Sequence, residues 1–366
     1  FELFGKKRED YIEFLPLDTW YRFHYADGST FDYGGTVEET LEEIRRIDPD
    51  EVEGYQRLLE HSKRIFDVGF TELADQPFHN VGTLLAQVPA MVRLQCYRTV
   101  WQLVCRYLKN DKLRRAFSIH PLLVGGNPFE TTCIYSLIHY LERKWGIFFA
   151  KGGTGALVDA LGRLMEEEGI KLRLNTTVEA IETEGRKCSA VRLEDGSRLA
   201  CDLVVSNVDP SFLYRKLLPE HSQPALFRLK KNRMKQSMGL FVLFFGTERT
   251  YEDVAHHTIW LTERFEALIR EIFHGDKLPE DFSLYLHRPT ATDKSFAPEG
   301  CDSFYVLAPV PNLDADIDWK TAGPKLRDRI VDALDETFLP GLKTSIRSDF
   351  FMSPEDFSSD YLSHKG

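Results

Sequence analysis

The sequence predicts a mixed fold with α/β and α+β parts, and three observations lead to this prediction. Aromatic and polar residues alternate on both sides of Asp27-Gly28, which is typical of a β-hairpin. Residues 81–115 are apolar with a helical pattern, and a glycine-rich loop at 151–155 leads into a helix followed by strand-like segments. At 366 residues, the chain is long enough for two or three structural units.

Composition excludes several classes of protein. Hydrophobic residues make up 43% of the chain and charged residues 28%, which is too apolar for a disordered protein. The net charge of -11 argues against a nucleic-acid partner, because phosphate contacts require a basic face. The six cysteines show no CxxC or histidine-paired spacing, so we predict no disulfide framework, no metal site and a reducing compartment. No apolar run reaches 18 residues, and no signal peptide is visible.

The N-terminal part contains a hairpin and then helices. Residues 19–33 form the predicted hairpin, and a helix begins at Pro49, with Asp48 as its N-cap, and continues to Phe66. The segment 81–115 is broken only by Pro89 and carries seven basic residues against one acid. It is either a buried helix pair with solvated basic edges or a basic amphipathic surface that lies on an anionic membrane.

The central part contains a corner, two helices and a series of strands. Gly125 and Gly126 form the corner, which is either a structural bend or a part of a substrate cavity together with Asn127. A helix is expected from Pro128 to about Gly146 and another over 156–167. Strands are expected at 170–174, 178–184, 188–193, 198–200 and 202–206, then in 237–246, 282–289 and 303–310, before an amphipathic helix that follows Gly323.

The loop Lys151-Gly152-Gly153-Thr154-Gly155 gives the best local signal for a cofactor. Glycines at the start of a helix allow backbone N–H groups to face a phosphate. A tight turn into a helix requires the same glycines, and the spacing matches neither GxGxxG nor the P-loop. The loop by itself leaves both interpretations open.

Five histidines could serve as a base, although a structural role is more common for each of them: His120, His139, His256, His257 and His287. His256 and His257 are adjacent, and strand positions next to one another point to opposite faces, so we expect them not to form a metal pair. Asp293 and Glu299 are expected to be turn or cap residues. The sequence therefore indicates no catalytic residue.

Longer motifs resemble the bacterial and fungal phytoene desaturases. They include "HPLLVGGNPFETTCIYSLIHYLERKWGIFFAKGGTGALVDAL", "LVVSNVDP", "AHHTIW", "DFSLYLHRPTATD" and "APEGCDSFYVLAPVPNL", in family order along nearly the whole chain. The resemblance implies an amine-oxidase-like flavoprotein with part of a Rossmann-like FAD domain, a mixed-sheet substrate domain and a helical membrane-facing subdomain. It also implies that Gly152 and Gly153, Thr177 and Val178, and Ser206 and Asn207 lie beside FAD.

The resemblance also implies a division of the chain. The substrate domain takes 1–40, 121–150 and 210–350, the helical subdomain takes 41–120, the central part of the FAD domain takes 151–209, and 351–366 return toward the FAD domain. The family's initial GxGxxG segment and its final glycine-rich segment do not occur here. We therefore interpret both ends as truncations and expect the chain alone to bind FAD poorly and to be inactive.

The activity implied by the resemblance is FAD-dependent dehydrogenation of phytoene, or of a similar acyclic carotenoid, toward lycopene. The substrate would be an unfunctionalised polyene that loses two hydrogens from adjacent saturated carbons, so the flavin would accept the hydride in an apolar tunnel. The expected location is cytoplasmic, peripheral on the inner face of the cell membrane, with residues 81–115 as the expected contact. The alternatives are a related carotenoid isomerase or oxidase, and a non-enzymatic module that binds apolar lipids.

Overall fold

The computed structural model describes residues 1–76, 81–185, 187–231 and 233–366. Its helices are α1 (Val37–Ile47), α2 (Val52–Phe66), α3 (Val81–Arg93), α4 (Val100–Tyr107), α5 (Asp111–Ala116), α6 (Leu137–Trp145), α7 (Gly153–Glu167), α8 (Pro210–Phe212), α9 (Ala225–Lys230), α10 (Phe265–His274), α11 (Trp319–Glu336), α12 (Leu342–Ser345) and α13 (Pro354–Asp360). Its strands are β1 (Phe14–Pro16), β2 (Thr19–Tyr25), β3 (Thr30–Gly34), β4 (Phe148–Ala150), β5 (Val178–Glu184), β6 (Lys187–Leu193), β7 (Arg198–Ala200), β8 (Gly239–Thr247), β9 (His257–Leu261), β10 (Leu284–His287), β11 (Asp302–Val310) and β12 (Ile346–Met352).

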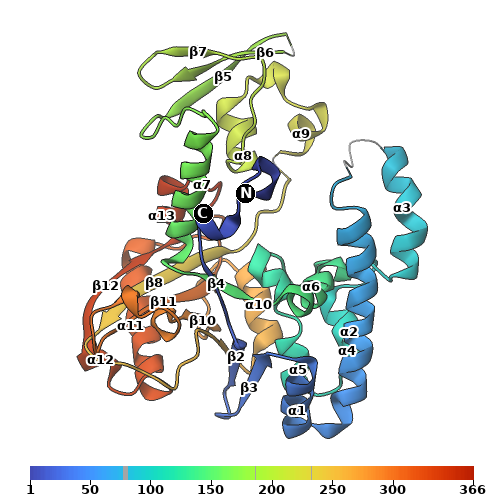
Figure 1. Ribbon diagram of the computed structural model, residues 1–366, viewed down its shortest axis with the longest axis vertical. Coiled ribbons are helices and arrows are strands. Elements are labelled where there is room, and N and C mark those ends of the chain that lie inside the picture. Colours follow the sequence, from blue (N-terminus) through green and yellow to red (C-terminus); the bar gives the residue numbers. More distant parts are fainter. Residues whose placement is uncertain (77–80, 186, 232) are drawn as a thin grey trace.

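A seven-stranded mixed sheet forms the centre of the molecule, in the order β12-β8-β11-β10-β9-β2-β3 (Figure 1). Only β2 and β9 pair in parallel among the described strands of this sheet. One face packs on α11, whose Leu326, Ile330 and Leu334 join a core with the inward side chains of β8, β10 and β11. The other face is covered by α10 and, further along, by the helical group α1, α2, α4, α5 and α6.

A second unit lies beyond α7. This helix leads from the large sheet to the three-stranded antiparallel sheet β5-β6-β7, beside which α8 and α9 lie (Figure 1). Its 15 residues make it about 22 Å long at 1.5 Å per residue. The length of α7 therefore sets the distance between the large sheet and the three-stranded sheet.

Most expected elements are confirmed. The hairpin around Asp27-Gly28, the helix that ends at Phe66 and the strands within 237–246, 282–289 and 303–310 are all present. The helix expected from Pro128 begins only at Leu137, because 133–136 form a 3-10 turn that precedes it. The helix expected after Gly323 begins at Trp319, where the Asp318 carboxylate caps it by accepting from the Lys320 N–H.

Two expected strands, 170–174 and 202–206, do not form. Both segments have the right apolar pattern, yet Leu174 is 81% exposed and Val205 is 90% exposed. Within the described residues, neither segment pairs with another strand. An extended segment without a neighbour leaves its N–H and C=O groups to water, so β-propensity alone does not produce a strand.

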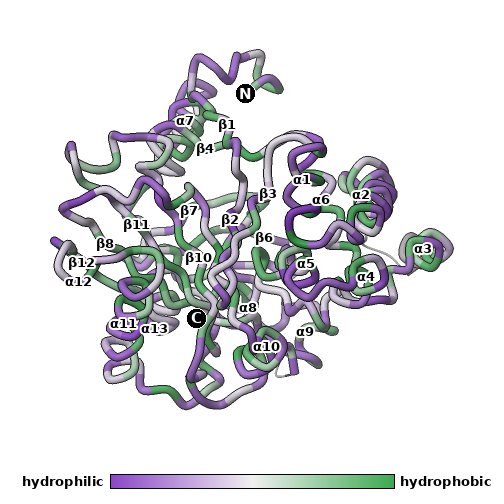
Figure 2. Tube along the Cα trace, turned by 90° about the horizontal axis from the view of Figure 1, so that it is seen from below, coloured by the Kyte–Doolittle hydropathy of each residue, from purple (hydrophilic) through white to green (hydrophobic). Residues whose placement is uncertain are grey.

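The helices of the segment 81–115 differ in how far they are buried. Helices α4 and α5 bury Val100, Leu103 and Leu113 in the core, as the expectation of buried helices requires. Helix α3 instead stands apart from the rest of the molecule. Figure 2 shows hydrophobic residues on this isolated helix. No helix in the described part of the chain is long and apolar enough to cross a membrane.

Candidate functional site

A row of aromatic side chains crosses the open face of the large sheet, the face opposite α11. Strand pairing places His257 opposite His287, His287 opposite Tyr305, Tyr305 opposite Phe244, and Phe244 opposite Phe350. Neighbouring rings lie close, with centroids 4.6 Å apart for His287 and Tyr305 and 4.7 Å apart for Phe244 and Phe350. We call these five residues the aromatic row. Residues directly opposite one another in a sheet share a face, so the register alone builds this surface.

An apolar cavity of about 520 Å³ lies over this face, between the sheet and α10. Its walls are almost entirely hydrocarbon and include Ile119, Leu122, Ile259, Leu268, Ile272 and Leu307. It reaches the surface near Leu123 and Val124, whose side chains are 50% and 59% exposed. Gly125 also lines the cavity, which supports the interpretation of the glycine corner as a cavity wall.

The polar groups of this wall are paired with one another. The Tyr285 hydroxyl lies 2.6 Å from Nδ1 of His257 and 3.4 Å from Nδ1 of His287. Burial raises the pKa of Tyr285 well above its ordinary value and lowers the pKa of His257 to about 2. Both groups are therefore neutral near pH 7, and the cavity presents an uncharged wall to its occupant.

A second cavity, of about 560 Å³, lies at the N-terminus of α7, and we call it the aromatic cavity. Gly153 and Thr154 line one side, and the aromatic row from His287 to Phe350 lines another. Phe149 and Phe296 complete the wall, with ring centroids 5.7 Å apart. Flat aromatic walls of this kind suit a flat aromatic guest.

The structure explains both predicted glycines of the 151–155 loop. Gly152 and Gly153 have φ values of +80° and +82°, which favour glycine, and a Cβ on Gly153 would come within 2.8 Å of the Phe296 ring. The N–H of Gly152 donates to Oδ2 of Asp293 at 2.9 Å. Asp293 also caps the turn at Ser295, which confirms its predicted role as a cap residue.

The other residues predicted to lie beside FAD are at a distance from this loop. Thr177 and Val178 lie at the start of β5, beyond the far end of α7 (Figure 1). Ser206 and Asn207 are exposed in the segment that follows β7. The structure thus separates the predicted residues into a group at the aromatic cavity and two groups near the small sheet.

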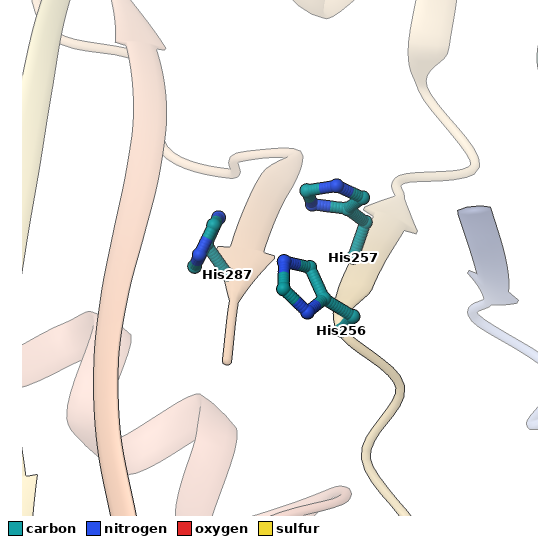
Figure 3. A group of neighbouring side chains, drawn as sticks. All are labelled: His256, His257 and His287. Atoms are coloured by element: carbon teal, nitrogen blue, oxygen red, sulfur yellow. The ribbon is translucent and has the colours of Figure 1, made fainter. Parts of the chain in front are cut away.

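The prediction that His256 and His257 point away from one another is wrong. His256 lies in the bend before β9, and only His257 belongs to the strand, so strand alternation does not apply to the pair. The rings of His256, His257 and His287 converge, with centroids between 4.5 and 5.2 Å apart (Figure 3). The sequence could have indicated part of this arrangement. Tyr285 and His287 are two residues apart in β10, so both side chains lie on the same face of the strand.

A buried polar network that the sequence did not reveal lies beneath β2 and β3. Glu142 of α6 accepts a hydrogen bond from the Tyr21 hydroxyl at 3.1 Å and lies 3.1 Å from Nε2 of His120. Nδ1 of His139 lies 2.8 Å from the Tyr33 hydroxyl. Burial holds the pKa of His139 well below its ordinary value. These contacts join α6 to the hairpin, which is a structural role for both histidines.

The match to known proteins decides the family. The model of the family described as "Flavin containing amine oxidoreductase" matches residues 5–283. The lycopene-forming phytoene desaturase of Pantoea ananas is 43% identical over 367 residues, which cover 100% of this chain and 75% of that protein. The chain belongs to the phytoene desaturase family of flavin-containing oxidoreductases.

Further comparisons agree with this family. The neurosporene-forming phytoene desaturase of Rhodobacter capsulatus is 35% identical, over 99% of this chain and 70% of that protein. Cyclohexylamine oxidase from Brevibacterium oxydans has the same fold, with a TM-score of 0.55 at 12% identity, over 99% of this chain and 71% of that one. The expected amine-oxidase-like flavoprotein fold is thereby confirmed, and with it FAD as the cofactor.

The residues of the aromatic cavity fit the ring system of a flavin. Phe149, Phe244 and Tyr305 offer flat faces on which an aromatic ring can stack, and no charged side chain other than Asp349 lines the cavity. The N-terminus of α7 also borders the cavity, but the Asp293 carboxylate lies beside it and accepts from the N–H of its N-cap residue, Gly152, which disfavours a phosphate there. The cavity therefore suits the ring part of FAD rather than its phosphates.

Proposed function

We propose that this protein catalyses FAD-dependent desaturation of phytoene, or of a similar acyclic carotenoid, in carotenoid biosynthesis. The observation that carries the proposal is the hydrocarbon-lined cavity over the sheet, which adjoins the aromatic row leading to the aromatic cavity. A long polyene has no polar group to recognise, and the described lining of this cavity is almost entirely apolar, with the Tyr285 hydroxyl and Nδ1 of His257 paired with each other. Relatives at 43% and 35% identity are named phytoene desaturases, which supports the same activity.

The chain's own residues would bind and orient the hydrocarbon. Removing apolar surface from water contributes about 25 cal/mol per Å², so the aliphatic walls provide affinity without hydrogen bonds. FAD, when bound, supplies the two-electron acceptor that a hydrocarbon requires. Phe244, Tyr305 and His287 line the aromatic cavity on the sheet face beside the apolar cavity, so the two guests would lie next to each other over one face of the sheet.

The test is an assay of the full-length, FAD-loaded protein with phytoene in liposomes. We expect bleaching of the flavin spectrum that depends on phytoene, together with products of increased conjugation. A product with an unchanged number of double bonds would favour an isomerase. Binding of phytoene without bleaching or product would favour a non-enzymatic lipid-binding module, and either result would overturn the desaturase proposal.

We propose in addition that the protein lies on the cytoplasmic face of a membrane, the reservoir of such a substrate, and that α3 makes the contact. Leu85 and Val92 on this helix are 62% and 60% exposed, and Val88 is 43% exposed. The exposed Arg93 lies at the end of the helix and Arg98 lies shortly after it, so apolar and basic groups occur together. This combination suits an anionic lipid surface.

The α3 contact predicts a specific loss of membrane binding. Replacing Leu85, Val88 and Val92 by serine is expected to weaken co-sedimentation with phosphatidylglycerol vesicles by at least about tenfold, because each apolar side chain loses roughly 1.5–3 kcal/mol of burial. The matched control replaces Leu203 and Val205, which are more exposed, at 77% and 90%, but distant in sequence from α3, and should leave binding unchanged. Equal effects of the two sets would exclude α3 as the contact.

A further inference from the structure

The converging histidines occupy a junction of three cavities. His257 lines the apolar cavity and His287 lines the aromatic cavity. His256 lines a third, open groove of about 700 Å³, whose wall also includes Asp18, Glu252 and Asp253. One ring nitrogen from each histidine lies within 4.8 Å of those of the other two. Polar solutes can therefore reach this cluster from the open groove.

Hydrogen bonds to neighbouring hydroxyl groups fix the orientation of two of the rings. Nδ1 of His256 lies 2.6 Å from the Thr292 hydroxyl, and Nδ1 of His257 lies 2.6 Å from the Tyr285 hydroxyl. If each Nδ1–H donates to its hydroxyl oxygen, each Nε2 has a free lone pair. Such outer hydrogen bonds orient the histidine ligands of metal ions.

One nitrogen of the cluster is buried without a partner. Nε2 of His256 has no hydrogen-bond partner among the described residues, although the side chain is only 5% exposed. A buried polar atom without a partner costs free energy unless a ligand satisfies it. Burial also lowers the pKa of His256 to about 4 and that of His287 to about 3, so the rings are neutral, which is the form that binds metals.

We propose that His256, His257 and His287 form a binding site for a divalent transition-metal cation, with Zn²⁺ or Co²⁺ as the fitting probes. Three imidazole nitrogens and one water complete a tetrahedral shell with bonds of about 2.0–2.1 Å. That geometry places the nitrogens about 3.3 Å apart, so rotations of the rings must close the present separations by up to about 1.5 Å. The water position faces a cavity, since each ring borders one.

The second histidine cluster also contains a buried nitrogen without a partner among the described residues, Nε2 of His139, but it lacks a free set of ligands and a route of entry. In the group His120, His139 and Glu142, the carboxylate already joins His120 and Tyr21, and the side chains of His120 and Glu142 are 3% and 5% exposed. None of the described cavities is lined by these three residues. A cation would have to displace existing hydrogen bonds and would have no route of entry.

The test is metal binding by the tag-free, full-length protein loaded with FAD, measured without reference to activity. Titration with Co²⁺ should give one equivalent of tetrahedral d–d absorption, at wavelengths longer than those absorbed by flavin. Calorimetry with Zn²⁺ should give a stoichiometry of one, and Zn²⁺ should raise the Tm. His287→Ala should abolish the Co²⁺ spectrum, whereas Thr292→Val should weaken Zn²⁺ binding by about 10–100-fold through loss of the outer hydrogen bond.

Control variants separate this site from others. His274→Ala removes an exposed histidine that pairs with Glu130 and should leave one equivalent bound. If His287→Ala fails to fold, Thr292→Val tests the same site through a residue that is not itself a ligand. Absence of a tetrahedral Co²⁺ spectrum, or a spectrum that persists in both His287→Ala and Thr292→Val, would overturn the proposal.

Discussion

Replacing Asp302 by alanine is expected to destabilise the protein by about 3–5 kcal/mol, because it leaves the buried charge of Arg288 without its partner. Arg288 is 2% exposed, and its Nε donates to Oδ2 of Asp302 at 2.9 Å. The same carboxylate accepts from the Tyr251 N–H at 2.7 Å and from the Thr290 hydroxyl at 2.6 Å. One substitution therefore removes the partners of three buried donors next to β10 and β11.

The urea midpoint measures this loss, and two further variants sharpen the measurement. Glu266→Ala removes an exposed pair with Arg270 at 3.6 Å and should cost less than about 1 kcal/mol. The double variant Arg288→Ala/Asp302→Ala should be less destabilised than the sum of the two single variants, because no unpaired charge remains in it. A midpoint for Asp302→Ala equal to that of Glu266→Ala would contradict the prediction.

The elements that depend on local sequence could be predicted from it. The Asp27-Gly28 hairpin, the helix ending at Phe66 and the buried strand within 303–310 follow from turn chemistry and periodicity, which act between near neighbours. The segments 170–174 and 202–206 show the limit of such reasoning. Their pattern is that of strands, but a strand also requires a partner, and the sequence does not reveal whether one is present.

The site could be predicted less well than the fold, because cross-strand register brings its residues together. His257, His287, Tyr305 and Phe244 belong to four strands that follow one another in the chain but lie in a different order in the sheet, and only pairing places them in a row. His256 shows a second limit. The argument that adjacent residues point apart is sound within a strand, but the strand begins one residue later. Element boundaries are the least certain part of sequence reasoning, and here the boundary decides the geometry of a cluster.

Obstructing the apolar cavity is expected to abolish desaturation while the fold and flavin binding remain. Leu268 lies on α10, is 1% exposed and lines this cavity, so Leu268→Trp would place an indole in the space that the polyene occupies. An elongated, stiff substrate cannot pass a bulky obstruction, and misplacement of the reacting carbons by about 1 Å can cost about 10²-fold in rate. We therefore expect turnover of phytoene to fall by at least about 10²-fold.

Ala267→Trp is the matched control, because the neighbouring position on α10 is exposed and does not line the cavity. Overpacking of a core costs about 1–3 kcal/mol, so the urea midpoint of Leu268→Trp must be measured beside its activity. The aromatic cavity does not include Leu268, so the flavin spectrum of the loaded protein should be unchanged. Wild-type turnover in a folded, flavin-loaded Leu268→Trp protein would show that the substrate does not use this cavity, and the proposed path of the polyene over the sheet would then be wrong.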